Sequence, residues 1–392
     1  MPHLSRPGLI WRKAAVLGSL WAASEIILGS FLHNAHVPFS GEFLTAIGII
    51  LLIAGHRLWP ERGLLWRTGF ICAAMKSISP SAIIFGPMLA ISMEGILCEA
   101  GVRLGGGNLA GYALAGGLAM CWAPIHKLGN LLLFYGPDTL KIYLRGIEWL
   151  RQSAGFTMNN SWVPIALLLT SYFLLGTVVA LAGMRAGTTE GSVQLFSSRN
   201  ETVKPDGQQG NTNNTNRKYS KIALLLHLSL VAVVMAYSRL IPAQLFIGGT
   251  AAYAYICARS YPRALALLKH TGLWIGILVT SLLAGVILGS AASGFYMALR
   301  AFILTVGFAA IGEGLLNPAI RSRLESLCGG VFFETLESAF LALPGIIAGL
   351  PSGREFARRP LAVLGGMVAR APFLLDSMQG SSAYPIRKRP AG

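Results

Sequence analysis

The sequence has little charge. Only 12% of its 392 residues are charged, against roughly 25% in an average soluble domain, and 54% are hydrophobic. Helical runs this apolar outnumber what a soluble core could bury, and several are long enough to span roughly 30 Å of hydrocarbon. We therefore predict an all-α fold and a polytopic integral membrane protein.

Motifs of enzyme chemistry are also missing. The sequence has no Gly-Lys pair and so no Walker A loop, and it has neither an HExxH nor a GxSxG motif. Its five cysteines lie singly in apolar segments without CxxC spacing, which argues against a disulfide framework or a zinc site. We predict no catalytic residue, no bound metal and no cofactor.

Acidic residues are scarce, with 16 Asp and Glu against 32 Lys and Arg. In a soluble chain this excess would suggest nucleic acid, but here the basic residues stand between apolar runs, so we expect a lipid bilayer partner and no nucleic acid. The positive-inside rule places the amino terminus and the loop with Arg57, Arg62 and Arg67 in the cytoplasm, and the loop 33–42 outside. We expect a multi-pass protein of the inner (cytoplasmic) membrane.

The first predicted domain, residues 1–185, holds six expected spans. They cover residues 13–32, 42–58, 63–78, 81–102, 107–127 and 161–184. The first is expected to be a retained helix and not a cleaved signal, because Glu25 interrupts its apolar run. Segment 137–155 has apolar residues at helical spacing and basic residues opposite, which predicts an interfacial amphipathic helix.

The composition then changes abruptly. Residues 186–221 are polar and rich in Asn, Thr, Gly and Gln, as expected for a flexible linker. The second predicted domain, residues 222–392, has about four spans near 222–240, 241–258, 271–290 and 294–312. The charged, Pro- and Gly-punctuated segments after residue 312 are expected to be amphipathic helices at the cytoplasmic surface.

Small residues form two rows along the first predicted helix. One row is Ala14, Gly18 and Ala22, and its neighbour is Ala15, Ser19 and Ala23. Small side chains four residues apart let another helix approach closely. The rows serve either packing within the first domain or docking of another membrane domain.

These rows, with PFSGEFLTAIGIILL from Pro38 and GPMLAISMEGILCEAGVRLGGG from Gly86, resemble the substrate-binding (S) component of energy-coupling-factor (ECF) vitamin transporters. The likeness covers about residues 10–185. It implies a six-helix fold whose first helix docks onto a transmembrane coupling (T) component.

The second half resembles a degenerate T component, through MALRAFILTVGF from Met297 and the charged helices that follow. T components contact their ATPases through Ala-Arg-small motifs. By this resemblance Arg370, in Ala369-Arg370-Ala371, and Arg358, in Ala357-Arg358-Arg359, would couple to an ATPase. The alternative for both arginines is anchoring to anionic lipid.

The resemblance implies a membrane subunit, not itself an enzyme, that imports a small water-soluble nutrient such as a vitamin or its precursor. Separate ABC-type ATPase subunits would hydrolyse the ATP. Pro2 stands where metal-importing members carry His, which disfavours metal as cargo. The alternatives are a membrane scaffold, a secondary transporter without an ATPase, or a membrane enzyme using Glu25, Glu94 or Glu99.

On this topology, polar and aromatic residues gather at the outer ends of four segments. The candidate substrate-binding residues are Asn34, Glu42, Lys76, Trp122, His126, Lys127, Asn130 and Trp162, with His36, Ser79, Asn159 and Asn160 beside them. Tryptophan walls with directional polar groups suit a small aromatic solute, although Trp and Lys also form ordinary interfacial belts. Lys127 and His126 favour an anionic substrate and Glu42 a cationic one, so the substrate's charge stays open.

Overall fold

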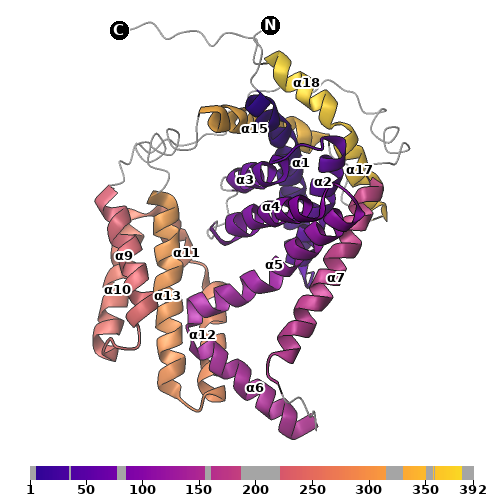
Figure 1. Cartoon of the computed structure of the whole chain (residues 1–392). Helices are drawn as coiled ribbons and strands as arrows, with labels where there is room; N and C mark the ends of the chain where they lie inside the picture. Colours follow the sequence, from indigo (N-terminus) through magenta and orange to yellow (C-terminus); the bar gives the residue numbers. More distant parts are fainter. Residues whose placement is uncertain are drawn as a thin grey trace, which may run out of the picture.

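The computed structural model of the chain describes residues 6–34, 37–76, 85–154, 160–186, 221–314, 330–349, 356 and 358–381. All regular secondary structure in these residues is helical, and Figure 1 shows the helices in two groups. The predicted linker, residues 186–221, lies outside the described residues apart from Ala186 and Lys221. The predicted domain boundaries therefore stay predictions.

Six helices form what we call the amino-terminal bundle. They are α1 (Arg6–Asn34), α2 (Ser40–Leu58), α3 (Leu64–Lys76), α4 (Phe85–Gly105), α5 (Leu109–Tyr135) and α7 (Val163–Ala186). Residues 14–25 of α1 are all buried, because α2 and α3 pack directly against this helix. The core around α1 is aliphatic, with Leu17, Trp21, Leu52 and Ile53 at most 2% exposed.

The helices α5 and α7 cross where two glycines meet, Gly116 and Gly176. Beyond this crossing the two helices diverge, and the amphipathic α6 (Asp138–Ala154) connects their far ends (Figure 1). The helix predicted at 137–155 is therefore present. Gly136, between α5 and α6, has φ = +80°, a left-handed conformation that glycine adopts without a Cβ penalty.

A second bundle contains α9 (Lys221–Tyr237), α10 (Ala243–Ser260), α11 (Pro262–Leu268), α12 (Thr271–Ile287) and α13 (Ala291–Gly314). Its core is separate from that of the first bundle and includes Phe246, Leu304 and Val306. His227 on α9 is buried between two tyrosines, with its ring nitrogens 2.9 Å from the hydroxyls of Tyr253 and Tyr261. These bonds satisfy a polar group that is costly to bury alone.

Arg300 on α13 joins the two bundles. It donates to the carbonyl oxygen of Leu133 on α5 at 3.1 and 3.2 Å, and to that of Met235 on α9 at 2.9 Å. Leu133 lies in the last turn of α5, where helix carbonyls have no partner in their own helix and attract a cation.

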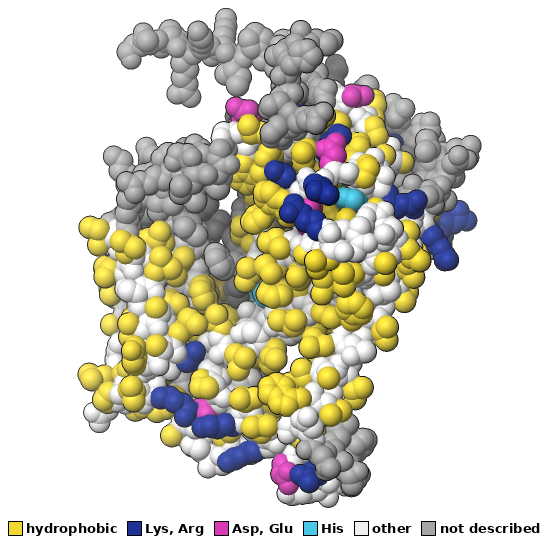
Figure 2. Space-filling view, in the orientation of Figure 1, with side chains coloured by type: hydrophobic (Ala, Val, Ile, Leu, Met, Phe, Trp, Pro, Cys, Tyr) yellow, Lys and Arg dark blue, Asp and Glu magenta, His cyan; other side chains and the backbone are white. Residues whose placement is uncertain are grey.

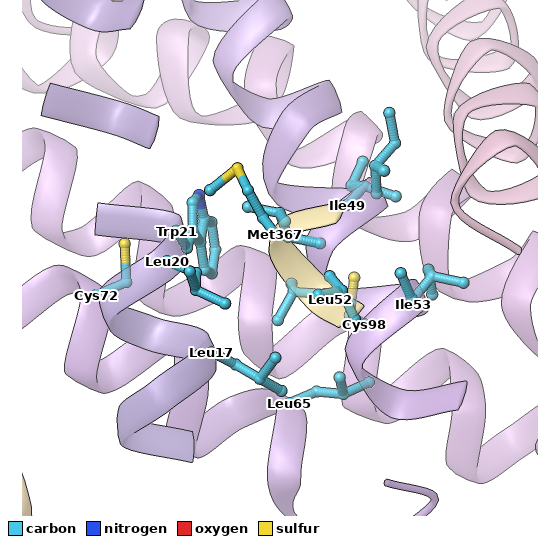
Figure 3. Close-up of a cluster of buried hydrophobic side chains, with 14 of the residues drawn as sticks. Leu17, Leu20, Trp21, Ile49, Leu52, Ile53, Leu65, Cys72, Cys98 and Met367 are labelled. Atoms are coloured by element: carbon cyan, nitrogen blue, oxygen red, sulfur yellow. The ribbon is translucent and has the colours of Figure 1, made fainter. Parts of the chain in front are cut away.

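The last three helices that the structure describes return to the amino-terminal bundle. They are α15 (Gly330–Ala348), α17 (Pro360–Ala369) and α18 (Ala371–Ser381). Their buried residues Ala339, Leu364 and Met367 belong to the same core as α1 and α2, and Figure 3 shows Met367 beside Trp21. Segments from opposite ends of the chain thus share one core.

Within the described residues, four helices are long and apolar enough to cross a membrane. They are Ser40–Leu58, Val163–Ala186, Ala291–Gly314 and Gly330–Ile347. The described residues therefore confirm the predicted all-α fold. Their apolar helices of membrane-spanning length are compatible with a membrane protein. Two further helices, Ile222–Tyr237 and Thr271–Ile287, are apolar but shorter.

The finer layout of six plus four spans stays a prediction. The helix α3 has 13 residues and reaches only about 20 Å at 1.5 Å per residue, short of the roughly 30 Å hydrocarbon core. Helices α1 and α4 carry charged residues within their apolar runs. Segment 330–347 was expected to lie at the membrane surface. In the structure it has the length and composition of a membrane span.

The glycine crossing yields a stability prediction. A Cβ at Gly116 would overlap the backbone carbonyl of Gly176, which cannot move aside as a side chain can. We expect Gly116→Ala to destabilise the bundle by about 1–3 kcal/mol through overpacking. The matched control is Gly129→Ala on the same helix, where a Cβ meets open space and a better helix former replaces glycine. Thermal unfolding in detergent measures both, and equal melting temperatures would contradict the prediction.

Candidate binding site

The predicted residues Glu42 and Lys127 meet in the structure. Glu42, in the first turn of α2, is 7% exposed. Its Oε1 forms an ion pair with Lys127 on α5 and accepts a 3.0 Å hydrogen bond from the hydroxyl of Tyr172 on α7. The other oxygen, Oε2, is buried without a hydrogen-bond partner. One oxygen of the Glu42 carboxyl group therefore has unused capacity to accept a hydrogen bond.

Three other candidates share one face of α5, since Trp122, His126 and Asn130 are four residues apart. The rings of Trp122 and His126 have centroids 5.9 Å apart and tilt by 31°, and the Asn130 side chain lies 3.5 Å from His126 Nε2. Trp122 Nε1 is buried without a hydrogen-bond partner. This face of α5 therefore has one unused hydrogen-bond donor, Trp122 Nε1, whereas Glu42 has one unused acceptor, Oε2.

The predicted residue Lys76 lies in a second charged pair. Its Nζ is 3.2 Å from Oε2 of Glu25 on α1, and the two side chains are 17% and 8% exposed. Close to this pair in the bundle, Glu94 on α4 accepts a 2.8 Å hydrogen bond from Thr45 on α2. Glu94 is 5% exposed. Removing such carboxylates from water is costly, and their partners offset that cost.

Together these residues form a polar cluster inside an apolar bundle, which we call the carboxylate cluster: Glu25, Glu42, Thr45, Lys76, Glu94, Lys127 and Tyr172. It has three carboxyl groups and two lysines, contributed by α1, α2, α3, α4, α5 and α7. Ionisable residues at membrane depth are rare and generally functional.

Of the remaining candidates, Trp162 and Asn160 are exposed and lie outside this cluster. Trp162 is 67% exposed, at the start of α7, and its backbone N–H bonds to the side chain of Asn160 at 3.0 Å. Asn34 is the last residue of α1. His36, Ser79 and Asn159 lie outside the described residues.

The two small-residue rows of α1 are buried throughout, and they face different helices. In the first row, Ala14, Gly18 and Ala22, a Cβ at Gly18 would lie 2.8 Å from Ile71 on α3. In the second row, Ala15, Ser19 and Ala23, the Ser19 hydroxyl lies 3.5 Å from the carbonyl oxygen of Ala339 on α15. One row therefore packs within the bundle and the other receives a helix from the second half of the chain.

The two predicted coupling arginines differ in their surroundings. Arg358 is exposed. Arg370 is partly buried between α17 and α18, and its side chain lies beside Gly349 at the carboxyl end of α15. The helix dipole favours a cation at the carboxyl end of a helix. Arg370 therefore has a structural role in addition to any role in binding a partner.

A second polar group lies at the opposite end of the bundle, where α1 begins. Glu99 on α4 accepts hydrogen bonds from the backbone of Gly63 at 2.6 Å and from Arg103 at 2.8 Å. Lys13 pairs with Glu61, and Arg57 donates to the carbonyl of Met184. Every one of these contacts ties a loop or a helix end, so we assign this end a structural role.

Sequence reasoning missed the partners within the cluster. From the sequence, Glu25 and Glu94 are candidates for the catalytic groups of a membrane enzyme but not for binding residues, and Tyr172 and Thr45 are not candidates at all. The signal available for the two glutamates is that each interrupts an apolar helix. Nothing in the sequence marks Tyr172, because tyrosines are common in membrane helices and only the fold places this one beside Glu42.

Comparison of the chain with models of protein families, with curated proteins and with solved structures finds no match. Among the described residues, no group of three or more His, Cys, Asp and Glu side chains is placed to hold a metal ion.

The two ion pairs of the cluster should differ in their effect on stability. Lys76→Met leaves Glu25 buried without its partner, and we expect a loss of about 3–5 kcal/mol, as for breaking a buried ion pair. Lys127→Met should cost less, because the Lys127 side chain is 58% exposed and water screens the pair. Thermal unfolding of both variants in detergent measures this order.

The double variant Glu25→Gln, Lys76→Met is the control. It removes both charges, so most of the lost stability should return. A double variant that is no more stable than Lys76→Met would show that the pair does not carry the effect.

Proposed function

We propose that this protein is a membrane subunit of an ECF-type importer, with an S-component-like domain fused to a T-component-like half. The observation that carries the proposal is the contact between Ser19 on α1 and Ala339 on α15. The resemblance implies that the small residues of the first helix dock onto the T component. Here a helix from beyond the linker packs on that face of α1.

In this proposal the amino-terminal bundle is the six-helix substrate-binding domain and α6 lies at the membrane interface. The second domain contains about four membrane helices, followed by coupling helices. The end of the first bundle where α1 begins carries Lys13, Arg57, Arg62, Arg67 and Arg103. This clustering of basic residues supports a cytoplasmic amino terminus in the inner membrane.

The carboxylate cluster and the polar face of α5 then belong near the outer end of the bundle, where an importer first meets its substrate. The cargo would be a small water-soluble nutrient, with a vitamin or a vitamin precursor as the class that the resemblance implies. Oε2 of Glu42 and Nε1 of Trp122 are the buried atoms free to bond to it. Separate ABC-type ATPase subunits would supply the energy.

A secondary transporter without an ATPase is the second candidate. The observation that favours it is the set of paired intramembrane carboxylates, Glu25 and Glu42, because ion-coupled carriers use such groups as proton relays. The two candidates differ in whether an ATPase binds the chain.

The contact between α1 and α15 can be tested from both sides. Ser19→Leu and Ala339→Leu each add bulk where both residues are 0% exposed, so α15 should separate from α1. We expect faster backbone hydrogen exchange over residues 330–349 in the purified full chain. The matched control is Leu341→Ser on the 78% exposed face of α15, which should leave exchange unchanged. Unaltered protection in both leucine variants would remove the docking contact.

ATPase coupling is tested by affinity purification from the native membrane, followed by proteomics and small-molecule mass spectrometry. We expect an ABC-type ATPase and a small solute to co-purify with the wild-type chain. Arg358→Ala should release the ATPase and retain the solute, because an exposed arginine fork is lost. Arg370→Ala should do so together with a loss of stability.

The control for charge is Arg62→Ala, another exposed arginine, which should retain both partners. Absence of an ATPase from chemically cross-linked wild-type membranes would favour the secondary transporter instead.

A further inference from the structure

A cleft of about 680 Å³ opens between α6 and α7, and no residue of the carboxylate cluster lines it. Ile147, Leu150 and Arg151 line it from α6, and Leu167, Leu168 and Ser171 line it from α7. This volume is within the roughly 300–1,000 Å³ of small-molecule sites. The cleft lacks the several convergent polar groups that such sites use to orient a soluble ligand.

The apolar walls of the cleft are exposed. Leu150, Leu167 and Leu168 are 46%, 59% and 47% exposed, and the last two lie on α7, a helix long enough to cross a membrane. The Ser171 hydroxyl is already bonded to the carbonyl of Leu168 at 2.7 Å. What remains open in the cleft is therefore hydrocarbon surface, which suits a hydrocarbon chain.

One cation lies on the cleft wall. The Arg151 side chain is 54% exposed, and its contact with Glu148, at 3.9 Å between two exposed groups, is weak. The other basic side chains of α6 are engaged, Arg145 with the carbonyl of Ile287 at 2.6 Å and Lys141 with Asp138 at 3.2 Å. Figure 2 shows basic side chains along the edge of the molecule where α6 lies. Arg151 can thus accept an anion in its guanidinium fork.

We propose that the cleft between α6 and α7 binds one acyl chain of an anionic phospholipid, with the headgroup phosphate on Arg151. The chain lies along Leu167 and Leu168, and the guanidinium group holds the phosphate through paired hydrogen bonds. A charged fork beside an apolar cleft matches an amphiphile and not a purely apolar or purely polar solute. This inference does not depend on the proposed transport function.

The position of α6 gives the lipid a structural consequence. This helix joins the diverging ends of α5 and α7, and Arg145 ties it to α12 of the second bundle. A lipid chain between α6 and α7 fills the space that these two helices leave between them. It therefore fixes the angle at which α6 bridges the two bundles.

The test uses the full chain in nanodiscs of phosphatidylcholine and phosphatidylglycerol, with a trace of phosphatidylglycerol carrying a photoactivatable acyl chain. We expect cross-links at residues 147–151 and 164–171, mapped by mass spectrometry. Leu168→Trp fills the cleft and should remove most of this labelling. Leu174→Trp, on α7 outside the cleft lining at a 59% exposed position, is the matched control and should leave it unchanged.

Headgroup selectivity is tested with Arg151→Gln in the same nanodiscs. Unlabelled phosphatidylglycerol should compete with the probe about fivefold better than phosphatidylcholine on the wild-type chain, as expected for one basic residue near the headgroup. Arg151→Gln should abolish this difference. A preference that survives would overturn the assignment of the phosphate to Arg151.

Labelling spread evenly along α7, and unchanged in Leu168→Trp, would mean that only ordinary annular lipid is present and would overturn the site. Melting temperatures of all variants verify folding. If Leu168→Trp does not fold, Leu167→Trp fills the same cleft from the neighbouring position and decides the question.

Discussion

The packing of both halves of the chain depends on the small side chains in the middle of α1. Its residues 14–25 are buried on every side, with α3 against one row of small residues and α15 against the other. In lipid the hydrophobic effect does not drive helices together, so their attraction comes from the close packing that small residues permit. Leucine at Gly18 would separate α1 from α3, and leucine at Ser19 would separate it from α15. The arrangement of both halves of the chain around one helix therefore follows from side-chain volume.

Burying α1 also places Glu25 inside the bundle, where an unpaired carboxylate would be costly. Lys76 offsets this cost from α3, and the same requirement operates for Glu42 with Lys127 and for Glu94 with Thr45. The carboxylate cluster is thus a consequence of helix packing and not an independent feature. Each acidic side chain contacts a residue on a helix other than its own. The two ion pairs and the hydrogen bond therefore also fix which helices are neighbours.

Periodicity and composition predicted the apolar helices of the described residues, because apolar spacing is a local property of the sequence. The pairing of Glu42 with Lys127 could be anticipated only as a common level in the membrane, since 85 residues separate them. Docking of another membrane domain on α1 was one of the two roles predicted for the small-residue rows, but the sequence could not single out α15, because the contact joins residues 320 positions apart. The sequence also could not predict that Trp162 is exposed. Its exposure follows from the divergence of α5 and α7 beyond their glycine crossing.

Two helices connect the carboxylate cluster to the second half of the chain. Helix α1 carries Glu25 within the cluster and Ser19 against α15. Helix α5 carries Lys127 within the cluster and Leu133, whose carbonyl is held by Arg300. Closely packed helices move as rigid elements and not by gradual deformation. Under the proposed function, a solute that took the place of Lys127 on Glu42 would therefore act on a helix whose last turn is fixed to the second bundle, which would give binding a direct mechanical route to the half proposed to receive energy from ATP.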